Sequence, residues 1–204
     1  MSYADDTEYA VRHLIELAVG EEALLEELKP FLANAEQRLK VHKWDFQTSD
    51  LNDDFSELYV MAAFARAASA GQEVNELKSE VARLQSLIGA HQVAVQSVCG
   101  AILQIAKQGI SIVHGGLENA PTGRMIGTVA LKSVVWQARN QAIHFEEGNF
   151  RPPVVQVFQE LEATFGAVFS LQTHAGQSRA KQVVDLLGWK SYSAYLSDAR
   201  HLGL

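Results

Sequence analysis

The sequence predicts an all-α protein: an up-and-down helical bundle with one long heptad-patterned helix. Apolar residues recur at intervals of three and four along most of the 204-residue chain, as on the buried face of an amphipathic helix. Runs that alternate apolar and polar residues, which are typical of strands, are scarce. Glycines, prolines and polar clusters divide the chain into segments of helical length.

Composition excludes several classes of protein. The chain has 48% hydrophobic and 20% charged residues, which argues against disorder. Its single cysteine, Cys99, cannot form an intramolecular disulfide or a cysteine-based zinc cluster. No signal peptide or membrane span is visible, so we expect a soluble cytoplasmic protein that does not contact a membrane.

The net acidity lies in the first 60 residues. The formal charge is −7, and residues 1–60 hold 14 acidic against 5 basic side chains, whereas the rest of the chain is nearly balanced. We therefore expect no broad basic face for duplex binding, although a local cationic site is compatible with these numbers.

The N-terminal stretch, Thr7–Lys43, has leucines at helical spacing and forms an acidic helical segment that we assign to residues 1–50. Gly20 and Pro30 are predicted to divide it, with Pro30 in the first turn of a new helix, because proline lacks the N–H that a helix interior needs. A polar connection over 45–54 should lead to a helix over 54–69 that ends at Gly71.

Residues 74–105 carry the clearest period. A helix of about 35 residues is predicted there, and it needs a partner along its length, either from the same chain or from a second subunit. His91, the polar member, is expected in the core or an interface, where it would specify register. The apolar positions are separated alternately by three and four residues, with His91 continuing the series: Val74, Leu77, Val81, Leu84, Ile88, His91, Val95, Val98, Ile102 and Ile105.

The remaining breaks come from glycine and proline. Residues 109–123 are predicted to form a loop with His114 on its surface. A helix over 125–147 should end at Gly148, and the following prolines should start a helix over 153–171. Short helices are expected over 179–187 and 191–199. We assign the bundle to residues 54–171, with residues 172–204 packed on it.

Common catalytic patterns are missing from the chain. There is no GxxxxGK[ST], GxGxxG, HExxH or GxSxG sequence, and no two of the seven histidines have the helical spacing of metal ligands. We therefore expect neither a metal nor another cofactor.

The run WQARNQAIHFEEGNF, residues 136–150, is the strongest candidate for a site. The planar guanidinium of Arg139 suits a phosphate, and the imidazole of His144 suits proton transfer near neutral pH. Asn140 shares a helix face with His144, so its amide could orient the imidazole. Arg139 lies about 140° around the helix from His144, so its long side chain, or a second copy of the helix, must bring the two groups together.

This motif resembles the R-x(4-6)-H signature of the HEPN superfamily, all-helical domains that are often metal-independent ribonucleases. The resemblance extends to the polar Asn140 and to the end of the helix soon after His144, and it covers about Asp54–Leu171. It implies an all-helical bundle and a homodimer in which two motifs line one cleft.

The resemblance also implies an activity, that of an endoribonuclease with an RNA substrate. The ribose 2′-hydroxyl would attack the adjacent phosphate without a metal, leaving a 2′,3′-cyclic phosphate and a 5′-hydroxyl. His144 would act as general acid or base, Arg139 would hold the phosphate, and Asn140 would fix the imidazole or the substrate. Such enzymes often act as toxins in toxin–antitoxin or phage-defence systems, so an antitoxin protein is an expected partner.

A structural interpretation stays open beside this one. Arg139 could pair with Glu146 or Glu147, and a histidine in the last turn stabilises a helix without any catalysis. The protein would then be a non-catalytic helical homodimer that serves as a protein-interaction or nucleotide-binding module.

Other side chains have two interpretations each. We expect the three tryptophans, Trp44, Trp136 and Trp189, to be core or interface anchors. Arg124, Lys132 and Arg151 would contact a phosphate backbone or carry ordinary solvated charge.

Overall fold

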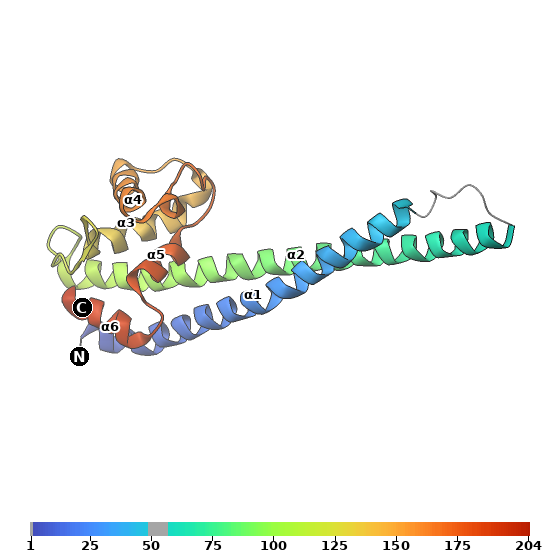
Figure 1. Ribbon diagram of the computed structural model, residues 1–204. Coiled ribbons are helices and arrows are strands. Elements are labelled where there is room, and N and C mark those ends of the chain that lie inside the picture. The colour runs from blue at the N-terminus through green and yellow to red at the C-terminus, as the bar shows by residue number, and fades with distance from the viewer. Residues whose placement is uncertain (1, 49–56) are drawn as a thin grey trace. The chain divides into compact units, whose positions relative to one another are not determined.

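The computed structural model describes residues 2–48 and 57–204, and the predicted all-α class is confirmed there (Figure 1). Two 3-10 helices, η1 and η2, and a two-stranded sheet accompany the six α-helices of this described part. In chain order the elements are α1 Tyr3–Thr48, α2 Glu57–His114, β1 Met125–Ile126, β2 Val129–Ala130, α3 Leu131–His144, η1 Phe145–Glu147, α4 Pro152–Phe165, η2 Ala167–Phe169, α5 Ala180–Leu187 and α6 Tyr192–His201.

The chain forms two compact units, and each of the two long helices contributes to both. Residues 1–21 and 93–204 form one unit, here called the main unit, and residues 22–92 form the other, here called the helix-pair unit. The division expected from the sequence, into residues 1–50, 54–171 and 172–204, stays a prediction.

The predicted breaks at Gly20 and Pro30 are wrong, because α1 continues through both residues. A proline inside a helix costs roughly 3 kcal/mol, since one backbone hydrogen bond is lost. Pro30 is exposed, so water can reach the carbonyl that it leaves without a helical donor. Apolar packing on both sides of the proline, by Leu28 and Leu32, offsets the rest of the cost.

In the helix-pair unit, the heptad positions of α2 are covered by α1 of the same chain. Val81 and Leu84 are buried against Ala35 of α1, and leucines of α1 surround them: Leu28, Leu32 and Leu39. A pair between His42 Nδ1 and Glu73 Oε2, 2.9 Å apart, lies beside this contact. Along this stretch the partner that the heptad pattern requires is therefore α1.

The predicted break at Gly71 is also wrong, because α2 passes through it. Residues 45–48 of the expected connection continue α1, and residues 49–54 lie outside the described residues. α2 also extends to His114, so the expected loop begins six residues later than predicted.

Gly109 does not form a turn but lets the Tyr3 ring approach the backbone of α2. A Cβ at this position would lie 2.6 Å from the Tyr3 ring. The Tyr3 hydroxyl donates to the Ile105 carbonyl at 3.0 Å.

Residues 125–130, predicted as helix, form a hairpin instead. Met125 pairs with Ala130 and Ile126 with Val129, around a turn in which Gly127 adopts a φ of +60°. A side chain on Gly127 would also meet Thr164 of α4 at 2.9 Å. Strands of two residues are too short for apolar alternation to appear in the sequence, and α3 begins only at Leu131.

The later helices begin close to their predicted positions. α4 begins at Pro152, as the two prolines suggested, but ends at Phe165 instead of residue 171. Gly166 takes a φ of +93° there, which favours glycine and ends the helix. α5 and α6 are confirmed within one or two residues, and the Ser191 hydroxyl caps α6 by accepting from the Ala194 N–H.

Asp198 of α6 joins three segments of the main unit. The carboxylate is 3% exposed and accepts from both Nε and Nη2 of Arg124, at 2.7 and 2.9 Å. It also accepts from the indole N–H of the buried Trp189 at 2.9 Å. These bonds to Asp198 raise the pKa of Arg124. The charge of Arg124 therefore fastens the segment before β1 to α6.

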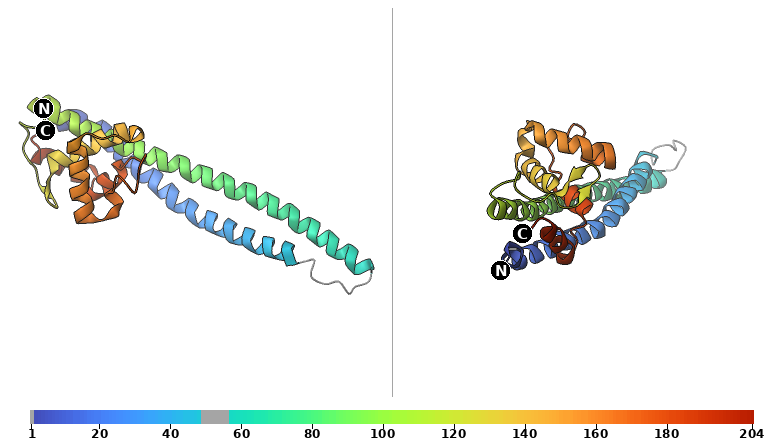
Figure 2. Two further views of the ribbon diagram at one scale, coloured as in Figure 1. Left: turned by 90° about the horizontal axis from the view of Figure 1, so that it is seen from above. Right: turned by 90° about the vertical axis from the view of Figure 1, so that its left-hand side faces the viewer.

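The first residues of α1 and the C-terminal residues lie side by side (Figure 2). The Tyr192 hydroxyl of α6 donates to the Ala4 carbonyl at 3.2 Å, and the Arg12 guanidinium lies 4.8 Å from the centre of the Tyr192 ring. The first turns of α1 and helix α6, which are far apart in the sequence, therefore pack together in the main unit.

One stretch of α2, Gly71–His114, is long and apolar enough to cross a membrane by length and composition alone. It contains a window with a mean hydropathy of 1.4, of which 22% is buried. A core helix of a water-soluble protein meets the same criteria. The expected cytoplasmic location and absence of membrane contact stay predictions.

We expect Gly109→Ala to lower the free energy of unfolding by about 1–3 kcal/mol, because its methyl group would overlap the Tyr3 ring. The matched control is Gly89→Ala in the same helix, where nothing lies within 4 Å. That change should raise stability by up to about 1 kcal/mol, since alanine favours the helix. Urea denaturation of both variants measures the difference, and equal effects would contradict the close contact at Gly109.

We expect Asp198→Ala to cost about 2–3 kcal/mol, because it leaves the buried Trp189 N–H without its acceptor and the Arg124 guanidinium without its counterion. Asp185→Ala serves as the control. Asp185 pairs with Lys181 and Lys190 but is 34% exposed, so its removal should cost less than about 1 kcal/mol. Thermal melts of the two variants, compared with the parent, test the importance of burial.

Candidate functional site

The candidate residues lie on α3, which runs antiparallel to α2 in the main unit. Three pairs, one helical turn apart, mark the contact. A Cβ at Gly100 would lie 3.8 Å from Ala142; the Gln104 amide oxygen accepts from Arg139 Nε; and Lys107 Nζ lies 4.2 Å from the centre of the Trp136 ring. We call these pairs the α2–α3 ladder. Other apolar side chains of α3, such as Val134 and Ala138, are buried.

Arg139 is half-buried and is held by neutral groups. In addition to the bond to Gln104, its Nη1 donates to the Asn140 side-chain oxygen at 3.3 Å. Within the described part of the chain, no carboxylate forms an ion pair with Arg139, so the expected alternative pairing with Glu146 or Glu147 is not observed. The guanidinium therefore keeps an uncompensated positive charge.

Asn140 positions the arginine. Its side-chain oxygen accepts from Arg139, and its Nδ2 donates to the Gln137 amide oxygen at 3.2 Å. The amide is thus engaged by Arg139 and Gln137 and has no hydrogen bond to the imidazole of His144. In this arrangement Asn140 fixes the guanidinium in place.

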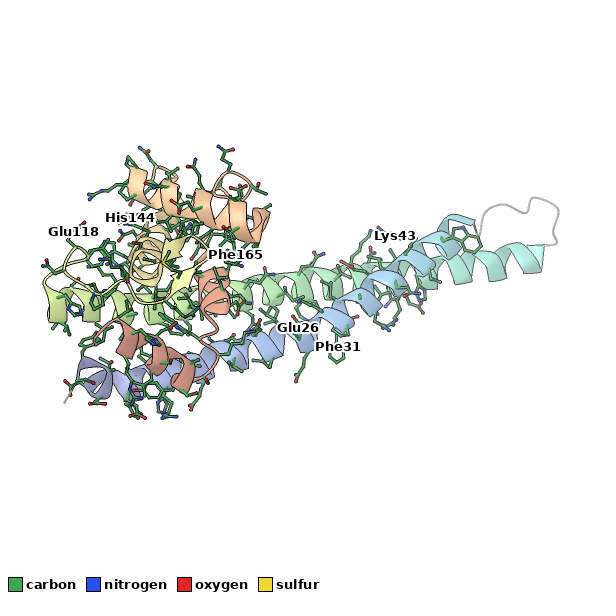
Figure 3. All side chains as sticks on the ribbon, turned by 60° about the vertical axis from the view of Figure 1, so that its left-hand side comes forward. Glu26, Phe31, Lys43, Glu118, His144 and Phe165 are labelled. Carbon is green, nitrogen blue, oxygen red and sulfur yellow. The ribbon has the colours of Figure 1, made fainter. Side chains whose placement is uncertain are left out.

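His144 is the last residue of α3 (labelled in Figure 3), and its side chain is 48% exposed. Its Nδ1 lies 2.7 Å from a carboxylate oxygen of Glu147 in η1. This contact favours a proton on Nδ1, which leaves Nε2 as the nitrogen that can accept a proton from a substrate. Gly148, with a φ of +66°, ends the turn that carries Glu147.

The structure does not bring Arg139 and His144 together in one chain. Arg139 reaches towards α2, and His144 contacts η1. Five residues of helix separate the two positions by about 7.5 Å along the axis and 140° around it. A site that uses both groups therefore needs a substrate that spans them or a second copy of α3.

Lys107 is a candidate that the sequence did not indicate. It is half-buried above Trp136, and burial, followed by the positive charge of Arg139, lowers its pKa. In the described residues no carboxylate pairs with it. A lysine 32 positions before Arg139 has no spacing signal that connects the two, because only the register of α2 against α3 places them together.

The other basic residues that the sequence offered as phosphate contacts are either structural or exposed. Arg124 binds Asp198, and Lys132 donates to the Ala120 carbonyl at 2.8 Å, where it ties down the loop after α2. Arg151 is exposed at the start of α4. The expectation of a surface loop at His114 is wrong: His114 ends α2, and its Nε2 lies 2.7 Å from the Leu202 carbonyl.

The three tryptophans differ in environment. Trp189 is 1% exposed and is the predicted core anchor, whereas Trp44 is 65% exposed. Trp136 is half-buried beneath Lys107. His91, the polar heptad position, is half-buried.

No group of three or more metal-binding side chains gathers anywhere in residues 2–48 and 57–204. Comparisons with models of protein families, curated proteins and solved structures find no match. Function therefore has to be inferred from the side chains of α3 and from those of α2 that face them.

We expect His144→Ala to change the free energy of unfolding by less than about 0.5 kcal/mol, because the imidazole is exposed. Gln141→Ala, one turn earlier, should cost about 1–3 kcal/mol. Gln141 is 1% exposed, donates to the Gln177 carbonyl at 2.9 Å and accepts from the Arg179 N–H at 2.8 Å. Urea titrations test both variants, and a large loss with His144→Ala would indicate a structural role for His144.

Proposed function

We propose that the chain is a metal-independent endoribonuclease of HEPN type. One observation carries the proposal: an exposed imidazole, oriented by a carboxylate, shares a short helix with an arginine that no carboxylate of the described residues neutralises. The first group can move a proton, and the second can bind a phosphate. The resemblance of Arg139, Asn140 and His144 to the R-x(4-6)-H signature supports the same reaction.

Each side chain has a role in this reaction. His144 Nε2 accepts the proton of the ribose 2′-hydroxyl, and the 2′ oxygen forms a bond to the adjacent phosphorus. The bond from phosphorus to the 5′ oxygen breaks, which leaves a 2′,3′-cyclic phosphate. Arg139 stabilises the charge on the phosphate oxygens in the transition state. Asn140 positions Arg139, and Glu147 positions His144.

A homodimer completes this chemistry. The 5′ oxygen leaves with a proton, so the reaction needs an acid as well as a base. Two copies of α3 facing one cleft would supply a neutral imidazole as the base and a protonated one as the acid. They would also let the arginine of one copy approach the histidine of the other, as an alternative to a substrate that spans the two groups of one chain.

The biological role that we propose follows from this activity. An RNase with no metal requirement in the cytoplasm would damage the cell that makes it, so it needs restraint. A toxin of a toxin–antitoxin or phage-defence system, held inactive by an antitoxin protein, fits this requirement.

We expect the purified protein to cleave a labelled single-stranded RNA in the presence of EDTA, and His144→Ala to lower the rate by 100-fold or more. Glu147→Gln should lower it less, because it removes the orienting carboxylate but keeps the imidazole. His201→Ala is the matched control, since His201 is also exposed at the end of a helix. It should cleave like the parent.

A His144→Ala variant that is folded and cleaves at the parent rate would contradict the proposal. Products with a 3′-hydroxyl would contradict it too, because attack by the 2′ oxygen leaves a cyclic phosphate.

The second candidate is a non-catalytic interaction module formed by a helical homodimer. Exposed apolar side chains on α1 favour it. Phe31 projects from the helix (Figure 3) and is 66% exposed. Val41 is 51% exposed. Stable assembly without any cleavage, in the same preparation, would support this module instead of the nuclease.

A further inference from the structure

We infer that Lys107 binds a phosphate that flanks the scissile one, so that Lys107 and Arg139 together follow the backbone of a single-stranded RNA along the α2–α3 ladder. This inference rests on the proposed function, because it takes RNA as the ligand. It adds a binding residue from α2 to a site that the sequence placed on α3 alone.

The first support is the charge of the ladder. Lys107 and Arg139 come from facing helices, one turn apart, and the described residues offer neither of them a carboxylate. Burial is the larger cost of keeping Lys107 charged, and the repulsion from the like charge of Arg139 adds to it. That cost is visible in the lowered pKa of Lys107. A bound anion would relieve the repulsion, whereas Arg124, a comparable arginine, already has Asp198 as its counterion.

The second support is that both cations are held in place before a ligand arrives. The Trp136 ring beneath Lys107 fixes the ammonium by a cation–π contact. Gln104 holds Arg139 through Nε, and Asn140 holds it through Nη1. Among the described residues Nη2 has no acceptor, so this end of the guanidinium can donate to a phosphate oxygen.

The third support is spacing. Trp136, and with it Lys107, lies two turns before His144 on α3, about 12 Å along the axis, with Arg139 between them. Lys107 is therefore too far from the imidazole to hold the phosphate that reacts. A nucleic-acid strand, which carries a phosphate at every nucleotide, can contact all three positions at once.

The test is RNA binding measured in the His144→Ala background, which prevents cleavage. Anisotropy of a labelled single-stranded RNA gives the affinity at several salt concentrations in EDTA. We expect Lys107→Gln to weaken binding about threefold to tenfold, equally for RNAs of different sequence. The slope of log affinity against log salt should become shallower by about 0.7, the value for one phosphate contact on a single strand.

Two further variants make the result specific. Lys78→Gln is the matched control, because Lys78 is exposed on the same helix far along the chain from the ladder, and it should leave affinity and slope unchanged. Lys107→Arg keeps the positive charge, so it should keep the slope. Thermal melts show whether each variant is folded.

The outcomes separate this inference from the proposed function. If Lys107→Gln binds RNA with the affinity and slope of Lys78→Gln, or if the parent binds no RNA, the inference is overturned. If the parent binds RNA but never cleaves it, and Lys107→Gln lowers affinity and slope as expected, the subsite stands and the nuclease proposal fails.

Discussion

Both compact units depend on the coverage of α2 by other segments of the chain. A helix of 58 residues with a continuous apolar face needs partners along its length, because most helical stability comes from packing. In the helix-pair unit leucines of α1 supply that partner. In the main unit, α3 covers the side of α2 that carries Gly100, and the Tyr3 ring covers the opposite side at Gly109, because positions nine residues apart lie about 180° apart around a helix. Glycine within this helix thus serves as a contact surface for another element.

The candidate site lies where the contact between α2 and α3 becomes polar. Along the α2–α3 ladder, a close contact at Gly100 is followed by Gln104 with Arg139 and by Lys107 with Trp136. Polar pairs of this kind stabilise less than apolar ones would, and the two cations repel each other. Residues at functional sites commonly reduce stability in this way. Arg124 differs from these two cations, because the carboxylate of Asp198 compensates its charge.

Much of the fold could be predicted from the sequence, because long periodic helices give a strong signal. The heptad pattern located α2, and Pro152 and Ser191 located the starts of α4 and α6. The predictions were wrong where packing between helices outweighed the local tendency of glycine or proline to end a helix. Pro30 and Gly71 looked like breaks, but apolar packing carries α1 through Pro30, and α2 passes through Gly71 without interruption.

The candidate site could be predicted only in part, for a related reason. Arg139, Asn140 and His144 do lie in the last two turns of α3, because their spacing is local. The sequence offers Glu147 as a partner for Arg139, whereas in the structure Glu147 contacts His144. Lys107 and Gln104 were not found, since their role depends on the register between two helices, and a single sequence contains no measure of that register.

The three tryptophans give the molecule built-in optical probes. Trp189 is buried and hydrogen-bonded to Asp198, so its emission should report on the packing of the main unit. Trp136 lies beneath an ammonium group, and its fluorescence should be sensitive to the position of that charge. Trp44 is largely exposed on α1, within the helix-pair unit. Variants that keep one tryptophan each would therefore report separately on the packing of the main unit, on the candidate site and on the helix-pair unit, without a foreign label in the chain.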